Sequence, residues 1–253
     1  MHKVVNIKNS PEIEMMRISG RLLAQVLRLI EQEVRPGIST YELNAIAEEF
    51  IKKHDATPTF KGYGGFPAAL CTSVNEELLH GIPSKKKILK EGDIISIDAG
   101  VNYHGWNTDA ARTFAVGSVS QEVQRLMDVT RESFFQGVPY AREGCRLHDI
   151  SARIQEHIES SGYQVVYEYV GHGVGRNLHE DPEIPNYGRA GTGIRLKAGM
   201  TLAIEPMVTI DVPEVHVLAD GWTVVSNDGK YCAHYENTVL VTKGEPEILT
   251  LEG

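Results

Sequence analysis

Hydrophobic and polar residues follow two different periods along the chain, and these periods predict its helices and strands. Between residues 10 and 33, apolar side chains recur at the spacing of one buried helix face: Ile18, Leu22, Leu23, Val26, Leu29 and Ile30. Ser10 and Pro11 are typical of a helix N-cap and first turn, and Pro36-Gly37 ends the pattern. A second helix is predicted to begin at Thr40, which we expect to act as its N-cap.

Similar patterns return 107 residues later. The segment RPGISTYELNAIAEEFI resembles REGCRLHDISARIQEHI, and LKEGDIISIDAG aligns with LKAGMTLAIEPM at the same offset, which matches Asp98 with Glu205. One offset shared by helices and strands predicts a duplicated α+β fold. We expect a single catalytic domain over residues 1–253, built from two similar halves, 10–115 and 120–242, about a pseudo-twofold axis.

An acidic pair lies on a predicted hairpin. In GDIISIDAGVNYHGWNTDAARTF, the alternation that ends at Asp98 indicates a strand, and the polar NYHG segment favours a turn. If the hairpin is centred between Tyr103 and His104, paired residue numbers sum to 207 and Asp98 faces Asp109. Two carboxylates in directly opposed positions repel each other, so a divalent cation between them is one explanation. The other is that one aspartate belongs to the turn and is solvated.

Further candidate ligands lie in the second half of the chain. His172 and His179 stand in the glycine-rich segment GHGVGRNLHEDP, and imidazole suits borderline divalent metals. Glu205 stands at the end of the apolar run in TLAIEPM, and Glu236 lies in CAHYENTVLVT, where three apolar residues from Val239 mark a buried strand. Acids on buried strands are costly unless they are paired or bind metal. Loop histidines and ordinary salt bridges are the alternatives.

Composition and missing motifs narrow the function. A net charge of -9 argues against a nucleic-acid partner and suits a site for cations or a charged amine. The three cysteines are widely spaced and predict free thiols. No signal peptide or membrane-spanning run is visible, so we expect a cytoplasmic protein that makes no membrane contact. The motifs of serine hydrolases, P-loop nucleotide binders and zincins are absent.

In the order of its candidate ligands, the chain resembles the type I methionine aminopeptidases. The resemblance runs from the first helix to ENTVLVT and rests on Asp98, Asp109, His172, Glu205 and Glu236, with His80 in NEELLHGIP and His179 in NLHEDP. It implies the pita-bread fold, an α+β arrangement of two halves around a dimetal cleft. It also implies removal of the initiator methionine from nascent polypeptides and peptides whose second residue is small.

The resemblance assigns two divalent ions, cobalt, manganese, iron or zinc, to these four acids and His172. Asp98 would chelate one ion, Asp109 and Glu236 would bridge the two, and His172 and Glu205 would complete the other shell. Glu205 would also accept and relay the proton of the attacking water.

The remaining assigned residues concern the substrate. His179 would stabilise the oxyanion, and His80 would contact the scissile amide nitrogen at the edge of the methionine pocket. The resemblance builds that pocket from Tyr63, Phe66, Cys71, Leu178 and Trp222. Leu178 stands where an aromatic residue is frequent, and Phe60 where a cysteine is common, which puts the selectivity of the pocket in question.

Two rival readings remain open. One is a proline-specific aminopeptidase of the same superfamily, although those enzymes usually carry an additional N-terminal domain. The other is an inactive relative that binds protein or RNA, although such proteins generally lose ligands.

The interval between His179 and Glu205 leaves no room for the insertion of type II enzymes, so the short bacterial form matches better. We expect a monomer, with the ribosome as a candidate partner.

Overall fold

The computed structural model describes residues 5–251, and its elements form two successive sets. The first set comprises α1 (Ser10–Glu33), α2 (Thr40–Lys53), β1 (Thr57–Pro58), η1 (Tyr63–Gly65), β2 (Leu70–Val74), β3 (Glu77–Leu79), β4 (Ile94–Tyr103) and β5 (Trp106–Ala115). The second set comprises α3 (Gln121–Gly137), η2 (Val138–Tyr140), α4 (Leu147–Ser160), β6 (Gln164–Val165), β7 (Gly171–Gly173), β8 (Glu180–Ile184), β9 (Thr201–Ile204), β10 (Met207–Thr209), β11 (Val215–Val217), β12 (Val224–Ser226), β13 (Cys232–His234), β14 (Asn237–Leu240) and β15 (Glu247–Ile248). Among the described residues, no helix is long and apolar enough to cross a membrane. The three cysteines are free thiols, as predicted.

The first two helices are present where the apolar periodicity predicts them, but their caps differ from the prediction. The N-cap of α1 is Asn9 and not Ser10: the Asn9 side chain accepts from the Glu12 N–H, and the Glu12 carboxylate accepts from the Asn9 N–H. Ser39 caps α2 in the same reciprocal way, in place of Thr40. Each observed cap has a glutamate three positions later, whereas the predicted caps have an apolar residue there, so only the observed caps can form a capping box.

The hairpin of β4 and β5 is present, but its register is shifted by two residues from the prediction. The loop is His104-Gly105, and both residues have positive φ, 50° and 85°, as a two-residue type I′ turn requires. Paired residue numbers therefore sum to 209, and Asp98 pairs with Ala111. The predicted direct opposition of Asp98 and Asp109 is wrong. A shift of two preserves the face of each side chain, so the two aspartates are diagonal neighbours on one face.

The 107-residue offset is visible in the backbone. Helices α2 and α4 begin and end at matching positions, and strands β4 and β9 begin at matching positions. Two glycine pairs at this offset share the left-handed conformation: Gly37 and Gly144 at φ 92° and 91°, and Gly92 and Gly199 at 89° and 93°. Side chains rarely adopt such angles, so the turns that precede these helices and strands are equivalent as well.

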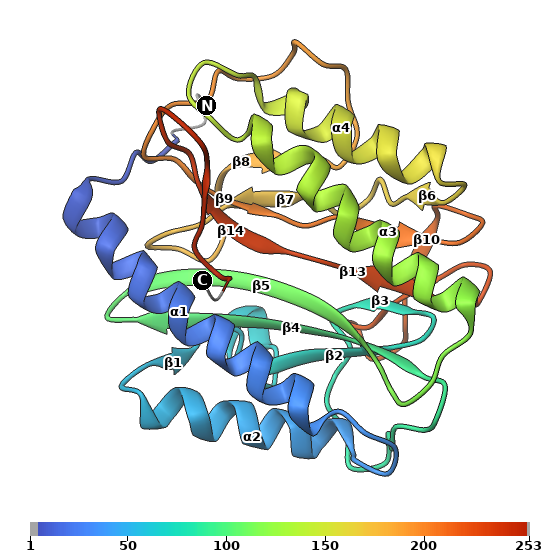
Figure 1. The fold of residues 1–253 in the computed structure, drawn as a ribbon. Coiled ribbons are helices and arrows are strands. Elements are labelled where there is room, and N and C mark those ends of the chain that lie inside the picture. The colour runs from blue at the N-terminus through green and yellow to red at the C-terminus, as the bar shows by residue number, and fades with distance from the viewer. Residues whose placement is uncertain (1–4, 252–253) are drawn as a thin grey trace.

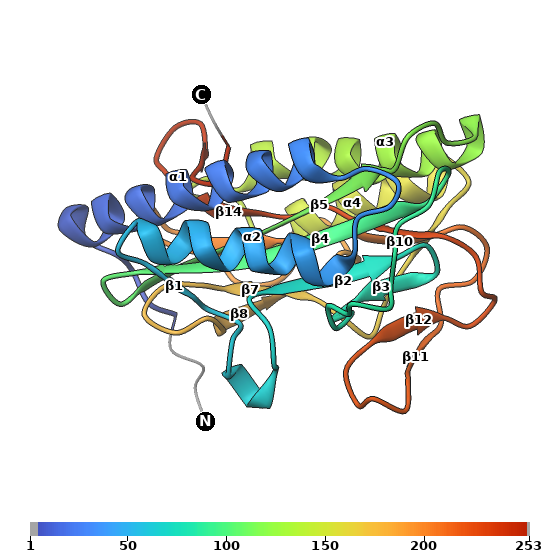
Figure 2. The ribbon, with the colours of Figure 1, turned by 90° about the horizontal axis from the view of Figure 1, so that it is seen from below.

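The helices cover one side of the strands and leave the other side for the site. One sheet has the order β1-β4-β2, with β5 paired to β4, and a five-stranded sheet has the order β15-β14-β9-β7-β8. α1 and α2 contribute one hydrophobic cluster with β4, and α3 and α4 contribute a second with β9 and β14. Figure 1 shows the two helix pairs and the strands between them. In Figure 2 the helices lie on one side, and β11 and β12 project from the opposite side.

Candidate metal centre and its pocket

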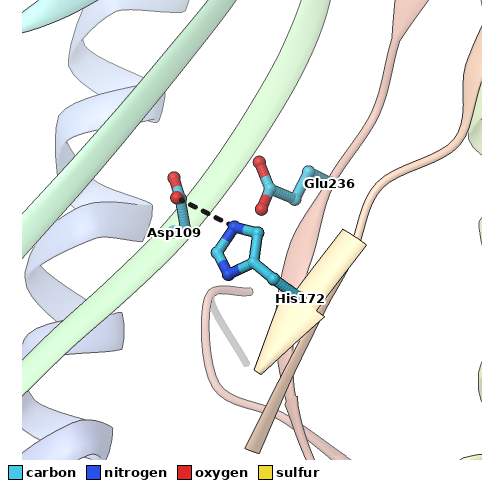
Figure 3. A group of neighbouring side chains, drawn as sticks. All are labelled: Asp109, His172 and Glu236. Atoms are coloured by element: carbon cyan, nitrogen blue, oxygen red, sulfur yellow. Dashed lines mark ion pairs between the residues drawn. The ribbon is translucent and has the colours of Figure 1, made fainter. Parts of the chain in front are cut away.

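Three buried side chains with ligand atoms meet from distant parts of the chain. Asp109 on β5, His172 on β7 and Glu236 just before β14 offer ligand atoms that all lie within 4.8 Å of one another (Figure 3). His172 Nε2 lies 3.8 Å from Asp109 Oδ2. The three residues are only 4%, 8% and 2% exposed, so bulk water does not solvate them.

The other two predicted ligands, Asp98 and Glu205, line the same pocket. Glu205 Oε1 lies 3.7 Å from His172 Nε2. This proximity follows from the sheet, because β9 pairs with both β7 and β14. Glu205 directly follows β9, so the sheet holds it beside His172 and Glu236. Asp98 enters from β4, diagonal to Asp109. The structure therefore brings all five predicted ligands together.

The buried carboxylates repel one another. Burial raises the pKa of Asp98 to about 7. Burial, together with repulsion between the acids, raises the pKa of Asp109, Glu205 and Glu236 well above the ordinary values. One oxygen each of Asp98, Asp109 and Glu236 has no hydrogen-bond partner among the described residues. Carboxylate oxygens beside an imidazole are a donor set for divalent transition metals, so these residues fit a metal site.

The protonation of His172 supports the same conclusion. Burial lowers its pKa to about 3, so the ring is neutral at pH 7. Its Nδ1 lies 2.8 Å from the carbonyl oxygen of Gly173 and can only donate to that acceptor. The Nδ1 proton leaves the lone pair on Nε2, which is the atom that faces Asp109 and Glu205. A backbone acceptor that fixes the tautomer is typical of metal-binding histidines.

Two further histidines line the pocket beside this cluster. The rings of His179 and His172 are 4.2 Å apart, and the Tyr63 hydroxyl lies 2.7 Å from His179 Nδ1. Burial lowers the pKa of His80 to about 4 and also lowers that of His179. His80 has positive φ, 58°, and its ring meets Trp222 edge to face at 6.5 Å. Neutral His80 can serve as a hydrogen-bond donor or acceptor at pH 7.

An apolar slot adjoins the acids. Trp222 and Phe66 meet edge to face at 5.1 Å, and the other predicted slot residues, Tyr63, Cys71 and Leu178, complete the wall. Phe60 also lines the slot, and a side chain at Gly100 would lie 2.9 Å from its ring. The whole pocket encloses about 170 Å³. Every residue predicted as a ligand, catalytic group or slot residue lines this one pocket.

Two residues next to the ligands were not predicted from the sequence. His234 is buried, and its Nε2 lies 3.6 Å from Glu205 Oε2. It stands two residues before Glu236, and the period of two in a strand would have placed both on one face. Arg112 donates to the Glu236 carbonyl and to Asn237 Oδ1, and thus ties β5 to the segment that carries Glu236. A larger hollow of about 430 Å³ between α1 and α3 contains none of the predicted site residues.

Comparison with known proteins identifies the family. The model of metallopeptidase family M24 matches residues 14–243. A methionine aminopeptidase of Clostridium acetobutylicum is 55% identical over 98% of this chain and 99% of the relative. The crystal structure of a methionine aminopeptidase from Thermotoga maritima superposes with a TM-score of 0.97 at 48% identity and covers 98% of this chain and 100% of that chain. A prolidase from Pyrococcus furiosus superposes at 0.78, with 26% identity over 98% of this chain and 66% of that chain.

These likenesses confirm the expected α+β pita-bread fold. They also separate the two peptidase groups, because identity and TM-score are both much higher for the methionine aminopeptidases than for the prolidase. The chain belongs to metallopeptidase family M24 and, within it, to the methionine aminopeptidases.

Proposed function

We propose that this chain removes the N-terminal methionine from peptides and nascent proteins, with a preference for a small second residue. The observation that carries the proposal is one pocket in which an apolar slot adjoins a buried cluster of acids and histidine. A thioether side chain is unbranched and packs well against aromatic edges such as those of Phe66 and Trp222. The substrate's charged α-amino group would face the acids, which restricts cleavage to the first residue.

Asp98, Asp109, His172, Glu205 and Glu236 would hold two divalent ions, with cobalt, manganese, iron and zinc as the candidates. The orphaned carboxylate oxygens, and the His172 Nε2 that faces Asp109 and Glu205, support this ligand set. Bound ions would supply a nucleophilic water at neutral pH and would polarise the scissile carbonyl.

Side chains of the pocket would then transfer the protons and stabilise the developing charge. Glu205, which lines the same pocket, would accept the proton of the attacking water as the new C–O bond forms. A Tyr63 hydroxyl that donates to His179 Nδ1 leaves the ring proton on Nε2, where it can bond the developing oxyanion. His80 would contact the amide nitrogen. Glu205 would pass its proton to that nitrogen when the C–N bond breaks.

Selectivity would depend on the width of the slot. Phe60 and Leu178 occupy its wall with Phe66 and Cys71. Burial raises the pKa of the Cys71 thiol, so this wall stays neutral. We further propose that the chain acts in the cytoplasm as a monomer, near the ribosome, and that residues 1–253 form one catalytic domain with halves 10–115 and 120–242.

A peptide panel tests this function. The metal-loaded protein should release methionine from Met-Ala-Ser much faster than it releases leucine from Leu-Ala-Ser. Ala-Pro-Ala tests the alternative of a proline-specific aminopeptidase, which the structural likeness to a prolidase motivates. Rapid release of alanine from Ala-Pro-Ala, with Met-Ala-Ser intact, would overturn the proposal. No cleavage of any peptide would favour an inactive binding relative.

A further inference from the structure

The segment that precedes α1 contacts the loop that carries Leu178 and His179. Lys8 Nζ lies 2.7 Å from Glu180 Oε2, and the two side chains are only 4% and 3% exposed. Asn6 Nδ2 donates to the same oxygen at 3.1 Å. The Lys8 backbone is fixed in turn, because its N–H donates to the Gly199 carbonyl at 2.8 Å.

Glu180 also closes the loop on itself. Its second oxygen, Oε1, accepts from the Asn177 N–H at 3.1 Å, across the turn that presents Leu178 and His179. Burial alone would raise the pKa of Glu180, but hydrogen bonds from Lys8 and Asn6 lower it below the ordinary value. The carboxylate is therefore ionised at neutral pH, and its charge depends on the lysine for compensation.

Gly175, which belongs to this loop, has no side chain, and the end of the Lys8 side chain fills the space. A side chain at Gly175 would lie 2.5 Å from Lys8 Cε and 2.9 Å from Glu180 Oε1. The loop is also tied to β5, because Asn107 Nδ2 donates to the carbonyls of Gly175 and Arg176 at 3.0 Å. Lys8 and Asn107 thus both hold the loop.

We propose that Lys8 is a positioning residue, whose buried ion pair with Glu180 fixes the loop that places Leu178 in the slot wall and His179 beside the ligand cluster. The proposal rests on the proposed function for its kinetic consequences, but not for its structural ones. Because Leu178 lines the slot, a displaced loop weakens binding of the methionine side chain. Because His179 faces the reacting carbonyl, the same displacement weakens stabilisation of the transition state.

Four variants test the proposal: Lys8→Met, Glu180→Gln, the double variant, and Lys53→Met as control. The control breaks the Lys53–Glu49 pair, whose side chains are 69% and 66% exposed. For each, kcat and KM on Met-Ala-Ser are measured with saturating Mn²⁺, and bound metal is counted. Hydrogen exchange of amides 174–181 is measured as well, because it requires no activity.

We expect Lys8→Met to raise KM and lower kcat, with a combined loss in kcat/KM of about 10–100-fold, the scale of a small misplacement of catalytic groups. Bound metal should stay constant, and faster exchange should be confined to residues 174–181. Adding Glu180→Gln removes the uncompensated charge and should recover part of the loss. Lys53→Met should match the wild type.

Either of two results would overturn the positioning role. One is a Lys8→Met protein with unchanged KM and unchanged exchange in the loop. The other is faster exchange throughout the chain with lower apparent kcat at constant KM, which indicates a smaller folded fraction and a merely structural lysine. If the wild type releases no methionine, the proposed function fails, whereas the exchange data still decide whether Lys8 fixes the loop.

Discussion

Replacing Asp98 with asparagine should stabilise the metal-free protein at neutral pH, although it removes a predicted metal ligand. Burial raises the pKa of Asp98 from an ordinary 3.8 to about 7. Near neutral pH the folded chain must therefore either bury this charge or keep a proton that the unfolded chain has released. Asparagine has nearly the same shape and no charge, so the variant avoids the penalty.

The magnitude follows from proton linkage. An acid whose pKa is raised in the folded state contributes stability that is fully present below pH 4 and is lost as the pH rises towards 7. A shift of about 3 units corresponds to ~4 kcal/mol at 1.36 kcal/mol per unit. At pH 5 the pH is only about one unit above the ordinary pKa of the unfolded chain, so the stability lost there is roughly 2 kcal/mol. The advantage of Asp98→Asn should therefore about double between pH 5 and pH 7.

Urea unfolding in EDTA at pH 5 and pH 7 measures this difference in the free energy of unfolding. Asp211→Asn, at a side chain that is 54% exposed, serves as the control and should show no such trend. Thermal scans measure the same difference independently, because Tm shifts by roughly 2–4 °C per kcal/mol for a chain of this size. The reasoning is refuted if Asp98→Asn is less stable than the wild type at pH 7 in EDTA, or if its advantage is the same at both pH values. Adding Mn²⁺ should favour the wild type, which keeps all its ligands.

Three further substitutions probe other parts of the site. His179→Ala should lower kcat by about 10²–10³ at nearly constant KM, and an unchanged kcat would remove His179 from the oxyanion role. Trp222→Ala should raise KM for Met-Ala-Ser by about tenfold through lost apolar contact, with bound metal unchanged, and a constant KM would place methionine elsewhere. Arg112→Met should lower the free energy of unfolding by roughly 2–4 kcal/mol, because it removes the hydrogen bonds that the buried guanidinium donates to the Glu236 carbonyl and to Asn237 Oδ1; urea unfolding equal to that of the wild type would contradict this.

Local signals in the sequence predict a large part of the fold. α1 has the predicted bounds because its apolar stripe and the following Pro36-Gly37 act within a few turns of helix. The 107-residue repeat was detectable because the same turn and helix geometry demands the same residue types, including left-handed glycines such as Gly37 and Gly144. The hairpin register was not predictable to this accuracy, because NYHG contains more than one pair that could form a two-residue loop. The choice of His104-Gly105 depends on both residues accepting positive φ.

The site, like the fold, contains residues that have a local signal in the sequence and residues that have none. Burial cost alone marks Glu205 and Glu236 as unusual acids, and the repeat links Glu205 to Asp98, but their roles came from the resemblance to a family. Contacts that join distant segments have no local signal. The Lys8–Glu180 pair spans 172 positions, and neither residue lies in a pattern that would select it. His234 could have been sought from strand periodicity, since it stands two residues before Glu236 in the sequence.

The central claim, that this pocket holds divalent metal which the chain needs to release N-terminal methionine, is tested most directly by a metal titration. EDTA-treated protein is titrated with Mn²⁺, while bound ions per chain and methionine released from Met-Ala-Ser are measured in the same samples, for the wild type and for Asp109→Asn. The account predicts no release before metal is added, release that rises with filling of up to two ions, and loss of both in Asp109→Asn. Full release by the metal-free wild type, or an Asp109→Asn protein that binds metal and releases methionine like the wild type, would contradict it.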